Sequence, residues 1–90
     1  MNITDIANLI NQTLVIKYRC NWRREAQWYA LFESAEIKEG NMLTGSFGNG
    51  ATPDDALQNY CREIAGKLMV FNAMGKNRME FTMPENLTSK

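Results

Sequence analysis

GNGATPDDALQNYCREIAG, residues 48–66, is the stretch with the clearest element boundaries in the chain. Thr52 is a favoured N-cap residue, Pro53 suits the first helical position, and Asp55 three residues after the cap completes a T-x-x-D capping pattern. Gly66 is typical of the left-handed position that ends a helix. Between these ends, apolar residues recur at helical spacing: Leu57, Tyr60, Cys61 and Ile64. The sequence therefore predicts an amphipathic helix between Pro53 and Gly66.

The glycines before this helix do not predict a phosphate loop. A G-x-G-x-x-G pattern would place its third glycine at position 53, where Pro53 stands. Asp54 and Asp55 occupy the first helical turn, where their carboxylates complement the helix dipole and would repel a phosphate. We therefore interpret Gly48-Asn49-Gly50 as a turn that leads into a capped helix.

The rest of the chain predicts one short helix and several strands. Alternation of apolar and polar residues is clearest around Leu14, Ile16 and Tyr18, which share one face of a strand. The αβββαββ order that results predicts a single α+β domain over residues 1–84, with an antiparallel sheet and two helices packed on one of its faces. We expect residues 85–90 to form a flexible tail. The predicted elements are helix 3–10, strands 13–20, 27–37 and 42–47, helix 53–65, and strands 68–72 and 78–83.

The predicted strand over residues 27–37 is apolar on both faces. Trp28 and Phe32 lie on one face, and Tyr29 and Leu31 lie on the other. If both helices cover one face, the other row forms an exposed apolar patch of the kind that marks an interface with a partner or a second copy. The alternative is that the second helix or the last hairpin buries this row.

Composition excludes most enzyme classes. The 90-residue chain has ten Lys+Arg residues, ten Asp+Glu residues and no histidine. Without an imidazole, no histidine-dependent triad, histidine–metal site or ordinary histidine base can form. Two cysteines are too few for a four-cysteine zinc site. We therefore predict no enzyme activity, no metal and no cofactor.

The two cysteines and the hydropathy pattern predict a cytoplasmic protein. The chain start has no basic segment followed by a continuous apolar run, so it does not resemble a secretory signal. No apolar stretch approaches the ~20 residues that span a membrane. Cys20 and Cys61 are accordingly expected to be reduced, packed thiols.

A basic and aromatic turn follows the first predicted strand. Trp22, Arg23 and Arg24 are consecutive, with Arg19 nearby. Trp and Arg are enriched at binding hot spots, and Arg with Trp also serves nucleic-acid binding. Protein binding is preferred because the chain has no net positive charge. The alternative is a structural turn in which the tryptophan folds over the sheet and the arginines pair with Glu25 or Glu33.

The segment from Gly50 to Ala56, GATPDDA, resembles the G-x-T-x-E-E-A stretch of HicB-like antitoxins. Their fold is related to the αβββα plan of double-stranded-RNA-binding domains. In the second half of the chain, the run from Ile64 to Asn72, followed by Arg78–Phe81 and Pro84, is similar to small uncharacterised proteins of phages and prophages. The resemblance implies blocking of a partner protein. It does not favour binding of double-stranded RNA, because Asp54 and Asp55 stand where that function needs basic residues.

These observations predict a non-enzymatic, phage-type accessory protein that binds and inhibits a host protein in the bacterial cytoplasm. The most specific target that analogy suggests is a CRISPR effector nuclease. The alternatives are a HicB-like antitoxin, a sheet-based nucleic-acid-binding module and a phage structural or assembly component. The predicted partner-binding residues are Trp22, Arg23, Arg24, Tyr29, Leu31 and Glu33.

Overall fold

α2 (Pro53–Ile64) begins and ends where the sequence predicts. The Thr52 hydroxyl accepts a hydrogen bond from the Asp55 backbone N–H at 3.1 Å. Gly66 takes the left-handed backbone conformation, with φ of +71°. The buried stripe of the helix consists of Ala56, Leu57, Tyr60, Cys61 and Ile64. Local capping chemistry and apolar spacing thus determine both the length and the orientation of this helix.

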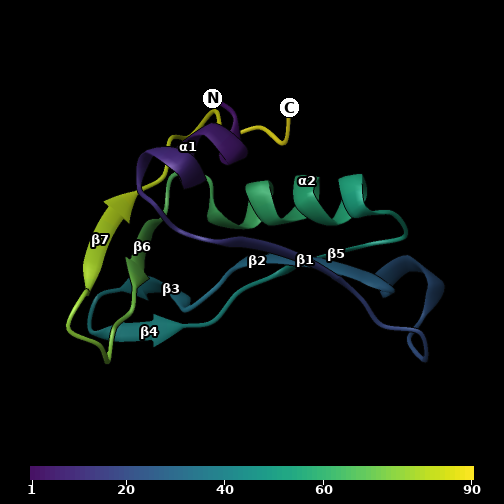
Figure 1. Cartoon of the computed structure of the whole chain (residues 1–90), viewed down its shortest axis with the longest axis horizontal. Coiled ribbons are helices and arrows are strands. Elements are labelled where there is room, and N and C mark those ends of the chain that lie inside the picture. Colours follow the sequence, from purple (N-terminus) through teal and green to yellow (C-terminus); the bar gives the residue numbers. More distant parts are fainter.

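The computed structural model describes residues 1–90 and has the predicted α+β fold, with antiparallel strand pairing throughout its sheets. Figure 1 shows the elements in chain order. They are α1 (Ile3–Leu9), β1 (Leu14–Tyr18), the 3-10 turn η1 (Arg24–Ala26), β2 (Trp28–Phe32), β3 (Ala35–Glu39), β4 (Met42–Thr44), β5 (Gly48–Gly50), α2, β6 (Leu68–Phe71) and β7 (Met79–Thr82).

The strands form two sheets, where the sequence predicted one. β1-β2-β5 make a three-stranded sheet and β4-β3-β6-β7 make a four-stranded sheet. The predicted strand over 27–37 is divided at Ser34, whose φ of +58° turns the chain between β2 and β3. The segment 48–50, predicted as a turn, is instead strand β5.

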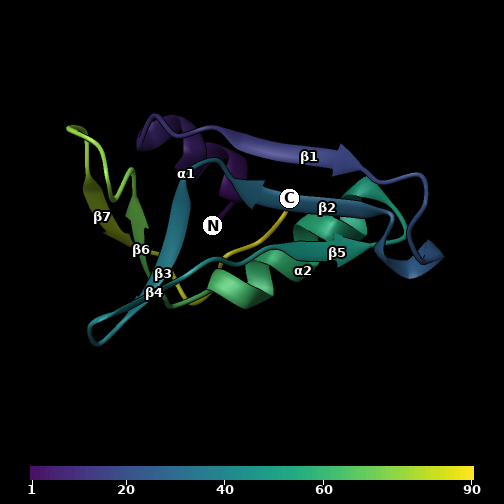
Figure 2. The ribbon, with the colours of Figure 1, turned by 90° about the horizontal axis from the view of Figure 1, so that it is seen from below.

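The two sheets are connected by one bent hairpin. Ile37 pairs with Thr44 beyond the bend, and Ala30 pairs with Gly48 before it. Residues 31–36 on one arm therefore face only residues 45–47 on the other. Extra residues on one arm of an antiparallel pair bend it and increase its twist. The bend carries each arm from one sheet into the other, as Figure 2 shows.

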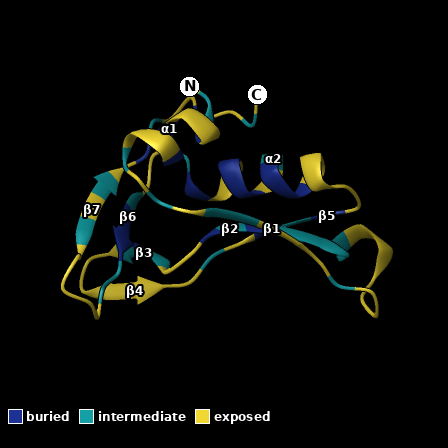
Figure 3. Ribbon diagram, viewed as in Figure 1, coloured by how far each residue is buried: buried dark blue, intermediate teal, exposed yellow.

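α2 packs on one face of the three-stranded sheet. Both helices lie on the same side of the strands, and the buried residues gather between α2 and the strands (Figures 1 and 3). Gly48 and Gly50 are buried beneath α2, so its backbone lies directly against β5. Phe32 on β2 forms edge contacts with Tyr60 and Phe71, at ring-centre distances of 6.0 and 5.3 Å. The aromatic contacts join α2 to both sheets.

The chain ends pack against each other. The Ile3 N–H donates to the Thr88 carbonyl at 2.8 Å, and the Thr88 N–H donates to the Met1 carbonyl at 2.7 Å. Leu87 is buried in the main core cluster. The sequence predicts a flexible tail over residues 85–90 and gives no sign of this docking. Apolar periodicity could not reveal it, because Leu87 stands alone among polar neighbours.

Tyr60 should make folding stability fall at alkaline pH. Its hydroxyl accepts a hydrogen bond from the Phe32 N–H at 3.0 Å, and burial raises the pKa of Tyr60 to about 12 from 10.0. The unfolded chain then loses this proton first, so stability is retained below pH 10 and falls as the pH rises toward 12. Two pKa units at about 1.4 kcal/mol each make the full loss roughly 3 kcal/mol.

Urea unfolding of the wild type and of Tyr60→Phe across this pH range measures the effect. The difference in unfolding free energy between the two proteins should shrink above pH 10. A constant difference up to pH 12 would contradict the prediction. The comparison with Tyr60→Phe separates the effect of Tyr60 from that of the neighbouring Cys61, because burial also raises the pKa of the Cys61 thiol to about 11.

Candidate functional site

The face of the three-stranded sheet that points away from α2 has no element packed on it. Strand alternation places Tyr29 and Leu31 on this face, opposite to the buried Ala30 and Phe32. We call it the open face. It consists of Val15, Lys17, Arg19, Tyr29, Leu31, Phe47 and Asn49. Tyr29 and Leu31 are half-buried by their neighbours on the sheet, so the predicted row is neither fully covered nor isolated.

Arg19 stands at the centre of an aromatic cluster at one end of the open face. Its guanidinium carbon lies 4.7 Å from the ring centre of Trp22 and 4.5 Å from that of Tyr29. The Phe47 ring centre is 5.9 Å away. Trp22 and Phe47 remain 55% and 51% exposed. The Arg19 cluster, meaning these four residues, thus joins the turn after β1 to the surface of the sheet.

Hydrogen bonds orient Arg19 within the cluster. Its Nη2 atom donates to the Ala26 carbonyl at 3.0 Å and to Oδ1 of Asn49. The Asn49 carbonyl in turn accepts a hydrogen bond from Nδ2 of Asn59 on α2, at 2.6 Å. The two hydrogen bonds that the Arg19 guanidinium donates are charge-assisted, which makes them stronger than hydrogen bonds between neutral groups. The cluster is therefore anchored to both η1 and β5.

A series of shallow hollows leads from the Arg19 cluster along β2, and each hollow includes Leu31. The first, about 250 Å³, is lined by Arg19, Tyr29, Leu31 and Phe47. The second, about 430 Å³, is lined by Val15, Lys17, Tyr29, Leu31, Glu33 and Ser34. The third, about 420 Å³, lies at the bend beside the turn after β6.

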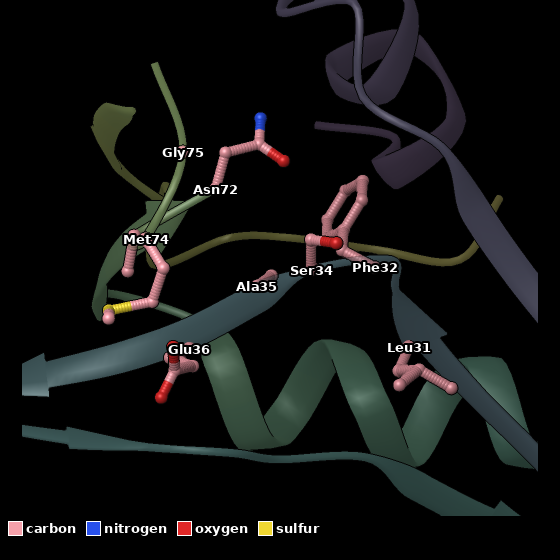
Figure 4. Close-up of a pocket in the computed structure, with 9 residues that line it drawn as sticks. Leu31, Phe32, Ser34, Ala35, Glu36, Asn72, Met74 and Gly75 are labelled. Carbon is pink, nitrogen blue, oxygen red and sulfur yellow. The ribbon is translucent and has the colours of Figure 1, made fainter. Parts of the chain in front are cut away.

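Figure 4 shows this third hollow. Leu31 and Glu36 lie on one side of the bent β2–β3 ribbon, and the Phe32 ring lies on the other. Met74 borders the hollow from the turn after β6 and is completely exposed. The three hollows together form a shallow groove, which runs from the open face to the outer side of the four-stranded sheet.

The structure brings together most of the predicted partner-binding residues. Trp22 and Tyr29 both contact Arg19, while Leu31 and Glu33 line the adjoining hollow. Arg23 and Arg24 are exposed and lie outside the cluster. Neither forms the ion pair with Glu25 or Glu33 that the structural alternative required. The ion pairs of the chain are Lys38–Glu80, Lys67–Glu39 and Arg78–Glu80.

Two residues of the cluster were not among the predicted partner-binding residues. In the sequence, Arg19 stands out only as a neighbour of the basic turn, although its position in the alternation of β1 puts it on the same face as Lys17. The sequence predicts Phe47 at the end of the strand over residues 42–47, but it does not show which face this residue occupies. The signal that could have identified it is the β2–β5 register, which, continued one residue past the Ala30–Gly48 pair, places Phe47 opposite Leu31.

The cysteines differ in environment, which corrects one expectation. Cys61 is buried on α2, and burial raises its pKa to about 11. Cys20 is exposed just after β1 and is not a packed thiol. The reason is that β1 ends at Tyr18, two residues before the predicted strand end, so Cys20 falls in the turn.

No group of three or more acidic or thiol side chains is arranged to hold a metal ion. Neither α1 nor α2 combines the length and apolar character of a membrane-crossing helix. Comparisons of the chain with protein-family models, with curated proteins and with solved structures found no match. The interpretation of the open face therefore depends on its own chemistry.

Proposed function

We propose that this protein acts without catalysis, by binding another protein through the open face and occluding it. The observation that carries the proposal is the Arg19 cluster, with Trp22 and Phe47 more than half exposed at the end of a groove. Trp, Tyr and Arg dominate the energetics of protein interfaces. Here their side chains are held in place by hydrogen bonds and packing before a partner arrives, which reduces the entropy lost on binding.

The proposal includes the role suggested by the resemblance, inhibition of a host protein by a phage-type accessory protein. Steric occlusion needs a rigid, exposed surface and no catalytic group. The target class suggested by analogy is a CRISPR effector nuclease. The protein would bind such a nuclease in the bacterial cytoplasm. The mixture of Lys17 and Glu33 along the groove suits a partner surface that carries both charges.

Affinity isolation from a bacterial lysate tests the proposal. The tagged wild-type chain should recover a stoichiometric protein partner, and Phe47→Ala should weaken its binding about tenfold or more, as truncation of a hot spot does. Met42→Ala is the matched control, because Met42 is a 70% exposed apolar residue on β4, outside the groove. Recovery of no partner would refute protein binding. Equal binding by both variants would refute the open face as the site.

A second candidate, single-stranded nucleic acid, is favoured by one observation. Three aromatic rings surround Arg19 on a sheet face that also carries Lys17, and such rings stack on bases. Binding would weaken steeply with salt. It would also be lost in the double variant Arg23→Ala/Arg24→Ala. A mobility shift of labelled oligonucleotides at low salt distinguishes this candidate from protein binding.

A further inference from the structure

β1 is an edge strand with one unpaired side. It pairs only with β2, and no other element lies along its outer edge in Figure 2. The Arg19 N–H donates to the Gln27 carbonyl, and the Glu33 N–H donates to the Thr13 carbonyl. Backbone groups alternate in direction along an antiparallel strand. The backbone N–H and C=O groups of the even-numbered residues Leu14, Ile16 and Tyr18 must therefore point outward from the sheet. They have no backbone partner there.

The side chains along this edge are apolar and partly uncovered. Ile16 and Tyr18 are 39% and 52% exposed, although they lie on the same sheet face as α2. α2 packs mainly against β5 and β2 and reaches β1 least. The edge has no proline and no bulge, two of the devices that prevent an edge strand from pairing with another chain. Its one charged side chain, Lys17, lies on the open face, away from the row of Leu14, Ile16 and Tyr18.

The other edges of the two sheets are less suited to pairing. β5 and β4 are only three residues long, and β5 lies beneath α2. β7 carries Glu80, which forms ion pairs with Lys38 and Arg78. Charged side chains on an edge strand oppose the approach of another strand. β1, with five residues, is the longest free edge and the most apolar.

We propose that β1 pairs antiparallel with β1 of a second copy of this chain, with Ile16 on the two-fold axis. In this register the outward backbone groups of Ile16 bond those of the partner's Ile16, and Leu14 pairs with the partner's Tyr18. The sequence around Ile16 thus complements itself, as a two-fold interface requires. The apolar side chains of Leu14, Ile16 and Tyr18 from the two copies would then pack side by side across the new strand pair, on the sheet face that carries α2.

Charge placement agrees with this register. Lys17 would face the partner's Val15, and Arg19 would face the partner's Thr13. No residue therefore faces one of like charge, which would destabilise the pair. The two three-stranded sheets would join into one of six strands, with both open faces on the same side. This inference is independent of what the open face binds.

The mass of the protein in solution tests the proposal. A two-strand contact buries less than a standard interface, so we expect a concentration-dependent dimer with a Kd in the roughly micromolar range. Light scattering on the eluting protein should approach twice the 10.3 kDa chain mass as concentration rises. Ile16→Glu should abolish the dimer by placing two carboxylates opposite each other. Lys17→Glu, with its side chain on the open face, should retain it.

A cysteine at the axis tests the register itself. Hydrogen-bonded residue pairs have Cα atoms ~5.5 Å apart, within the range that a disulfide spans. In a Cys20→Ser background, Ile16→Cys should therefore form a disulfide-linked dimer on mild oxidation. Lys17→Cys should not, because its counterpart is offset by two residues. Failure of Ile16→Cys to cross-link, or a monomeric wild type at all concentrations, would overturn the proposal and leave the edge to a strand of another protein.

Discussion

Gly48→Ala should destabilise the protein by about 3 kcal/mol or more, although it adds a single methyl group. A Cβ at Gly48 would lie far closer than 3.0 Å to backbone atoms of Tyr60 and Ala56 in α2. Backbone atoms of a helix cannot rotate away, so α2 as a whole would have to lift from β5. Overpacking of a core costs typically 1–3 kcal/mol, and rigid neighbours place this case at or above the upper end.

Urea unfolding followed by circular dichroism measures this effect, and the chain supplies a control. Gly45 lies in the same hairpin arm, has no atom within 4 Å of an added Cβ, and does not have the positive φ that favours glycine. Gly45→Ala should therefore change stability by less than about 0.5 kcal/mol, as an ordinary surface change does. If both alanine variants are equally stable, α2 does not lie directly on β5.

The close packing of α2 on β5 is a feature that the sequence alone could not predict. The caps and stripe of α2 could be predicted because they depend on residues within one helix. The glycines at 48 and 50 were interpreted as a turn, because glycine has low strand propensity and carries no side chain to show alternation. Their role is set by what packs above them, which is a tertiary property.

The bend between the two sheets was missed for a related reason. The residues from Trp28 to Phe32 are continuously apolar, and Ile37 is again apolar, so residues 27–37 read as one strand. The division depends on the left-handed conformation of Ser34 and on the unequal arms of the hairpin. A register difference between two segments cannot be obtained from either segment alone.

The candidate site was partly predictable. The sequence placed Trp22, Tyr29 and Leu31 among binding residues because aromatic and apolar side chains at a turn and on a spare strand face indicate an interface. It did not predict that Arg19 would connect the turn to the strand. That contact requires β1, β2 and β5 to lie side by side, which only the pairing of strands distant in sequence provides.

Replacing Arg19 with methionine should release the turn that carries Trp22. The variant keeps an apolar stem but removes the hydrogen bonds to Ala26 and Asn49 and the stacking with the rings. Hydrogen bonds to charged groups contribute about 1.5–3 kcal/mol and each exposed cation–π contact about 0.5–1 kcal/mol. We expect stability to fall by about 3 kcal/mol, together with a red shift in the fluorescence of Trp22.

The fluorescence can be assigned to one residue, because the chain has only two tryptophans. In a Trp28→Phe background, emission reports on Trp22 alone. Arg23→Met is the matched control: it removes the same charge from an exposed position that forms no ion pair, so both emission and stability should stay within error. A red shift for Arg19→Met only would mean that Arg19 holds Trp22 in place. Unchanged emission in both variants would mean that Trp22 is already free in solution, and the open face would lose its preformed anchor.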